Sequence, residues 1–196
     1  MQTLRHHLRT STRMEHERLD AAFSTLDLTR RDGLSRFLLS HFMALSGCHA
    51  RLDQLDDLPA MLRPPSLLPE IQADLQVLGV SRREPQGLKL TGQMSSLGIC
   101  YVIAGSRLGT KLLQRRWAQS HDPQVLRAGQ YLSSGTYDNY WPQFVKYLDG
   151  MLAPDDNRAA IERSARLTFR LFGDALEWAN TELDYDKTEF DVSHSG

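Results

Sequence analysis

The chain has 196 residues, a length that favours one domain with its own hydrophobic core over two independent domains. Hydrophobic residues make up 41% of it and charged residues 24%, which is typical of a soluble globular protein and excludes a disordered or fibrous one. Lysine and arginine number 23 against 24 aspartate and glutamate residues, so the formal net charge is −1. We therefore expect no general nucleic-acid binding, because no overall positive field is available for a phosphate backbone.

The two ends of the chain carry opposite charge. The first 14 residues contain three arginines and two histidines but no acid, whereas residues 182–196 contain five acids and one lysine. No apolar run is long enough for a membrane span or a secretion signal, so we expect a cytoplasmic protein without a membrane partner. Two cysteines, Cys48 and Cys100, lack CxxC spacing, which indicates neither a disulfide framework nor a zinc site.

Apolar periodicity predicts helices along the whole chain, and no segment keeps the alternation of a strand. The predicted helices cover, in order, residues 4–26, 30–55, 70–78, 92–120, 125–132, a segment from Tyr137 to Leu148, and 157–183. The proline-rich stretch 58–69 is predicted to be a surface connection. The fold class is therefore all-α: a single-domain bundle of seven to nine helices over residues 1–184, followed by an acidic tail at 185–196 that is frayed or disordered.

His16 is the first candidate for chemistry. It shares a helical stripe with Thr12, Leu19 and Phe23, so the imidazole is expected to point inward. Asp20, one turn later, can accept the Nδ1 proton, which leaves Nε2 free as a metal ligand. The alternative is a core histidine that is hydrogen-bonded to a neighbour.

Two arginines precede His16 on the same predicted helix. Arg9 and Arg13 lie seven and three residues before it, so their guanidinium groups are expected along the same face. They can hold carboxylates there, or they belong to a solvated helix face.

Three glycines interrupt the predicted helix over 92–120. Gly98, Gly105 and Gly109 are spaced i, i+7 and i+11, and each costs a helix interior about 1 kcal/mol relative to alanine. Their shared face is a strip of bare backbone that a flat partner can approach and where the helix can kink. Close packing of another helix is the alternative explanation.

One planar ligand suits both the histidine and the glycines. Haem carries an iron for an imidazole and two propionates for guanidinium groups, and its flat face fits a strip without side chains. These residues together therefore point to haem held between His16 and the glycine strip.

The same stretches resemble the biliverdin-producing haem oxygenases, especially the short bacterial members. The similarity is carried by LRTSTRMEHERLDAAF at 8–23 and YVIAGSRLGTKLL at 101–113, and more weakly by YWPQFVKYLD and ARLTFRLF. The order of these motifs, their separation and the chain length agree with that family. The resemblance implies a haem oxygenase-type bundle and an enzyme for which b-type haem is both cofactor and substrate.

The resemblance also implies a role for each matching residue. His16 matches the proximal iron ligand, and Asp20 matches the acidic residue that hydrogen-bonds it. Gly105 and Gly109 match the glycines of the distal helix, and Ser106 occupies the position beside them where mammalian members carry an aspartate. The implied propionate contacts and pocket-lining residues are Arg9, Arg13, Lys146, Tyr101 and Phe169.

The implied reaction consumes O₂ and electrons from a separate reductase or ferredoxin. Oxygen attacks a meso carbon of the ring and yields biliverdin, CO and iron, for iron acquisition or as a chromophore for a bilin-binding photoreceptor. The distal glycines let the helix press on the bound oxygen, and water held by Ser106 supplies protons.

Three positions depart from the family's pattern. Ala104, Ser106 and Thr110 replace two acids and a second glycine, which motivates the alternative of a related protein that binds or senses haem without degrading it. A thiamin-degrading helical protein needs a nucleophilic cysteine beside carboxylates, and Cys100 has no acid nearby in sequence. A helical scaffold with no ligand is the remaining alternative.

Overall fold

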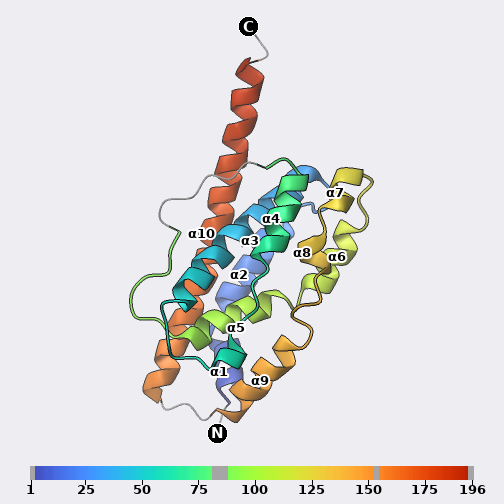
Figure 1. Cartoon of the computed structure of the whole chain (residues 1–196). Helices are drawn as coiled ribbons and strands as arrows, with labels where there is room; N and C mark the ends of the chain where they lie inside the picture. The colour runs from blue at the N-terminus through green and yellow to red at the C-terminus, as the bar shows by residue number, and fades with distance from the viewer. Residues whose placement is uncertain (1–2, 81–87, 152–154, 194–196) are drawn as a thin grey trace.

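The computed structural model describes residues 3–80, 88–151 and 155–193, and the regular structure in these ranges is entirely helical. The all-α prediction is thus confirmed. Figure 1 shows helices gathered around α3, α5 and α10, with the C-terminal end of α10 projecting beyond the rest. The elements are α1 (Leu4–Ser11), α2 (Arg13–Ser24), α3 (Arg31–Leu52), the 3₁₀ helix η1 (Ala60–Leu62), α4 (Leu68–Val77), α5 (Ser96–Ser106), α6 (Thr110–Trp117), α7 (Pro123–Arg127), α8 (Gln130–Ser133), α9 (Tyr140–Gly150) and α10 (Asp155–Ser193).

The first predicted helix is in fact two. Thr12 separates α1 from α2 with φ −103° and ψ 10°, and its buried hydroxyl donates to Leu8 O at 2.8 Å. Leu4 and Leu8 are completely buried, whereas no residue of α2 is. Helix α1 is therefore packed into the core, and α2 lies along the edge of the bundle.

The prediction of one long helix over 92–120 is wrong. The helix ends at Ser106 and restarts at Thr110, because the intervening amides bond three residues back: Arg107 N to Ala104 O at 3.3 Å and Leu108 N to Gly105 O at 3.0 Å. Such tight bonds end an α-helix, and glycine favours the break. The α5–α6 turn, residues 107–109, thus replaces the middle of the predicted helix.

Two other predicted boundaries change. The predicted helix over 125–132 is two short helices, α7 and α8, and the buried Asp74 carboxylate accepts the backbone N–H groups of Gln130 and Tyr131 at the start of α8. The last helix continues to Ser193 instead of ending at Leu183, so residues 185–193 of the predicted frayed tail are helical. Residues 194–196 of that tail lie outside the described ranges.

The core forms where α10 packs against α3 and α5. A Cβ placed on Gly98 of α5 would lie 2.3 Å from Ile161 O and 2.7 Å from Ser164 Cβ, so this glycine exists for close packing of α5 against α10. Close helix packing, one of the two explanations of the glycine strip, therefore holds for Gly98.

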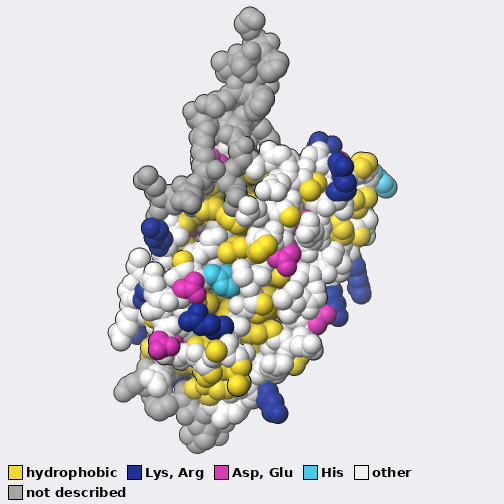
Figure 2. Space-filling model, viewed as in Figure 1, with side chains coloured by type: hydrophobic (Ala, Val, Ile, Leu, Met, Phe, Trp, Pro, Cys, Tyr) yellow, Lys and Arg dark blue, Asp and Glu magenta, His cyan; other side chains and the backbone are white. Residues whose placement is uncertain are grey.

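The near-zero net charge is unevenly spread. No acid occurs between residues 93 and 121, and Figure 2 shows Lys and Arg side chains along the α6–α7 edge of this face. Within the described ranges, every helix is too short or too polar to cross a membrane.

Candidate functional site

His16 lies on α2 with its ring held from two sides. Its Nδ1 is 3.0 Å from Asp20 Oδ2, so the carboxylate accepts the Nδ1 proton and Nε2 stays free. The ring also meets Phe169 of α10 edge-on, with centroids 5.9 Å apart. The predicted contact with Asp20 is present, but the imidazole does not point fully inward: 55% of the side chain is exposed, because α2 runs along the edge of the bundle.

Tyr101 of α5 lies near Thr12, the residue between α1 and α2. Burial raises the pKa of Tyr101, while the interaction with the Thr12 side chain and the charges of Arg9 and Arg5 lower it. One turn beyond Thr12 on α2 is His16, and one turn beyond Tyr101 on α5 is Gly105. Residues four apart share a helix face, so His16 lies on the side of the chain that Thr12 marks, and Gly105 on the side of α5 that Tyr101 marks.

The glycine strip divides into two kinds of position. A Cβ added to Gly105 or Gly109 would meet no heavy atom within 4 Å, in contrast to the crowded Gly98. The prediction of one continuous strip over the three glycines is therefore wrong, since only the two at the α5–α6 turn leave open space.

Ser106 and Arg107 hold the α5–α6 turn. The Ser106 hydroxyl donates to Ile103 O at 2.8 Å, so its proton is used within α5, while its oxygen can still accept a hydrogen bond from water. Arg107 Nη2 donates to Tyr131 O at 3.1 Å, and its guanidinium lies 4.5 Å from the centroid of the Tyr131 ring. These contacts fix the turn against α8.

The predicted carboxylate-binding cations are only partly brought together. Arg5 of α1 pairs with Asp149 of α9 at 3.4 Å. The two helices are antiparallel (Figure 1). Arg9 lies one turn beyond Arg5, and Lys146 lies three residues before Asp149, so both exposed cations reach the same level of the bundle.

Arg13 does not join Arg9 and Lys146. Its Nε donates to Glu17 at 2.7 Å on the same helix, and 74% of the side chain is exposed. This geometry is that of a solvated helix face, the alternative considered for this residue.

Arg166 of α10 is a site residue that sequence reasoning missed. Its Nε donates to Glu162 at 2.9 Å, and its other nitrogens bond the Glu15 carboxylate of α2 and the Ser11 carbonyl at the end of α1. It therefore ties the start of α2 to α10, one turn before Phe169. Arg166 belongs to the ARLTFRLF stretch, which the sequence analysis singled out. Its pairing with Glu15, 151 residues away, cannot be predicted from spacing within one helix.

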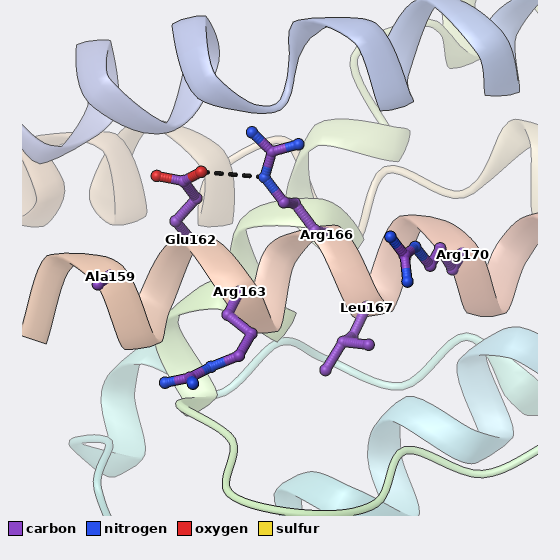
Figure 3. Close-up of a pocket in the computed structure, with 6 residues that line it drawn as sticks. All are labelled: Ala159, Glu162, Arg163, Arg166, Leu167 and Arg170. Atoms are coloured by element: carbon purple, nitrogen blue, oxygen red, sulfur yellow. Dashed lines mark hydrogen bonds and ion pairs between the residues drawn. The ribbon is translucent and has the colours of Figure 1, made fainter.

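A shallow cavity of about 260 Å³ lies beside Arg166 on α10, lined by Ala159, Glu162, Arg163, Arg166, Leu167 and Arg170. None of the predicted site residues lines it. Figure 3 shows Arg163 pointing away from Arg166, so these arginines do not converge on one anion. The cavity therefore shares no lining residue with the predicted site around His16.

Neither the cysteines nor a cluster of metal-binding side chains marks a second candidate site in the described ranges. Cys48 and Cys100 are free thiols and buried; burial raises the pKa of Cys100 to about 12 and that of Cys48 far above its ordinary value. A thiol so poorly ionised is a weak nucleophile, which argues against the thiamin-degrading alternative. No group of three or more His, Cys, Asp or Glu suited to a metal ion occurs among these residues, whereas a haem iron needs only one protein ligand.

No family model matches this chain, and no curated protein matches it significantly. The resemblance to haem oxygenases is therefore one of short motifs. Any function has to be supported by the residues that α1, α2, α5 and α9 bring together.

Proposed function

We propose that this protein binds b-type haem in the space between α2 and the α5–α6 turn, with His16 Nε2 as the axial ligand, and that it acts as a haem oxygenase. One observation carries the proposal. His16 and Gly105 each follow, by one helical turn, one of two neighbouring residues, Thr12 and Tyr101, and a Cβ on Gly105 or Gly109 would meet no heavy atom within 4 Å. A flat ligand with a metal centre suits such a gap.

The residues present suit haem in three respects. Asp20 at 3.0 Å fixes the His16 tautomer and makes the ring a better ligand. Phe169, edge-on to the imidazole, provides an apolar wall for a macrocycle. The exposed cations Arg9 and Lys146 lie at one level of the bundle, where propionates would meet them at the solvent edge.

When bound, haem supplies the iron at which O₂ is reduced, with electrons from a reductase or ferredoxin, and the ring that is oxidised to biliverdin with release of CO and iron. The chain contributes the positioning. Gly105 and Gly109 leave room on the distal side and present no acidic or imidazole proton donor there. Because the Ser106 proton is held by Ile103 O, protons have to arrive through water entering at this solvent-exposed edge.

A hemin titration tests the proposal directly. We expect one hemin per chain, with a Soret band characteristic of a histidine ligand. His16→Ala should lose that spectrum and regain it when free imidazole is added, whereas His121→Ala, an exposed histidine in the α6–α7 connection, should bind like the wild type. An unchanged hemin spectrum with the wild-type protein would refute haem binding.

A second function, haem storage or sensing without turnover, is favoured by one contact. The Ser106 hydroxyl, the nearest candidate for a distal proton donor, is already hydrogen-bonded within α5. Adding ascorbate or a reductase to the hemin-loaded protein in air separates the two functions. Growth of biliverdin absorbance identifies an oxygenase, and a haem spectrum that persists identifies a binding protein.

A further inference from the structure

The junction of α1 and α2 is held by a single side chain from the far end of the sequence. Arg166 bonds the Ser11 carbonyl at the end of α1, the Glu15 carboxylate in the first turn of α2, and Glu162 on its own helix. Glu162 in turn lies 2.9 Å from His7 Nε2 of α1. One guanidinium therefore connects three helices.

These contacts replace the usual stabilisation of two helix ends. The last carbonyls of α1 have no N–H donors within the helix, and a cation there also opposes the helix dipole. Helix α2 begins at Thr12 without a side-chain cap. With Arg166 bound to both ends, the angle between α1 and α2 is fixed from α10.

The burial of Glu15 makes this contact demanding. Only 18% of the Glu15 side chain is exposed, and its second carboxylate oxygen is buried without a hydrogen-bond partner. Arg166 is thus the cation that compensates a poorly solvated carboxylate, so the contact cannot be given up as easily as a surface ion pair.

His16 is the next residue after Glu15, and Phe169, which meets the His16 ring, is three residues after Arg166. We infer that Arg166 is a positioning residue for His16: held to Glu15 and Ser11, it sets the direction in which the imidazole faces the gap between α2 and α5. The functional meaning of this inference rests on the proposed haem site, but the contact can be tested without haem.

The haem-free test is the nuclear Overhauser effect between the His16 and Phe169 rings. Arg166→Gln should reduce this signal, and Glu15→Gln should reduce it in the same way. Arg166→Lys, which keeps the charge but not the fork, should recover part of it. The matched control is Arg170→Gln, one turn further on α10, exposed and without an ion pair to another described residue; it should leave the signal unchanged.

The hemin-loaded protein gives the second readout. Arg166→Gln should shift the iron–histidine stretching frequency and speed hemin loss about tenfold, the effect of one lost charge-assisted hydrogen bond. A folded Arg166→Gln protein with an unchanged ring signal overturns the inference. If Arg166→Gln does not fold, an unchanged ring signal in folded Glu15→Gln overturns it instead. If the wild type binds no hemin, the proposed function fails, while the ring signal still decides whether Arg166 positions His16.

Discussion

Glycine occurs near both ends of α5, but its surroundings differ at the two ends. At Gly98 the helix presses so closely on α10 that a single added carbon would meet the backbone of Ile161 at 2.3 Å, whereas at Gly105 the same carbon would meet nothing within 4 Å. The histidines repeat the contrast. His41 is buried among aromatic rings of α2, α3, α8 and α10, while the His16 side chain is 55% exposed. Gly98 is thus required by the packing of α5 against α10, whereas Gly105 leaves open space beside α5.

The largest effect is expected from Gly98→Ala. Its Cβ would clash with Ile161 O and with the Ser164 side chain, and backbone cannot move aside as a flexible side chain can. We expect the free energy of unfolding to fall by about 3 kcal/mol, the upper range for overpacking, measured by urea denaturation of the haem-free protein. If Gly98→Ala were as stable as Gly105→Ala, the contrast between the two ends of α5 would not hold.

Acid should reveal the buried histidine. Burial, together with the charge of Arg107, lowers the pKa of His41 to about 4, while an unfolded histidine titrates near 6.5. Between these values the unfolded chain binds a proton that the folded chain does not. Stability therefore falls as the pH drops from about 6.5 to about 4, by roughly 3 kcal/mol in total.

The variant His41→Phe isolates this effect from other titrating groups. It keeps a ring among Phe23, Phe37, Tyr131 and Phe172 but removes the proton acceptor. The difference in unfolding free energy between wild type and variant should therefore change with pH across this window. Parallel curves for the two proteins would show that His41 does not titrate as described.

Gly105→Ala should act in the opposite direction to Gly98→Ala. The added methyl meets no neighbour and improves helix propensity, so the haem-free protein should gain up to about 1 kcal/mol. The larger Gly105→Leu fills the gap and should weaken hemin affinity about tenfold or more, by calorimetric or spectroscopic titration. If Gly105→Leu binds hemin as the wild type does, the space beside α5 is not the haem site.

The local features of this site could be predicted from the sequence because they depend on spacing within one helix. The His16–Asp20 contact follows from a four-residue step on α2, and the all-helical fold follows from apolar periodicity. The break between α5 and α6 was missed because the glycines were interpreted as one strip of bare backbone on a continuous helix, although Gly98 and Gly105 have different neighbours. Periodicity cannot tell a glycine that faces a helix from one that faces open space.

Contacts between distant segments lay beyond such reasoning. Nothing in the sequence pairs Glu15 with Arg166 or aligns Arg5 with Asp149, since these pairs depend on how α1 and α2 lie against α9 and α10. The same limit applies to the exposure of His16. Its stripe predicted an inward ring, but α2 runs along an edge where that stripe is only partly covered.

The smallest effects are expected from the exposed cations Arg9, Lys146 and Arg13. Arg9→Gln and Lys146→Gln should each weaken hemin affinity about threefold, because an exposed cation gains little from a carboxylate in water. Arg13→Gln is the matched substitution at an exposed arginine of α2, and it should leave hemin affinity unchanged, since that guanidinium already donates to Glu17 at 2.7 Å. Raising the salt concentration should remove the differences, as it does for surface ion pairs. Were Arg13→Gln the most damaging of the three, the propionate edge would lie along α2 instead of between α1 and α9, and the haem would be turned in its gap.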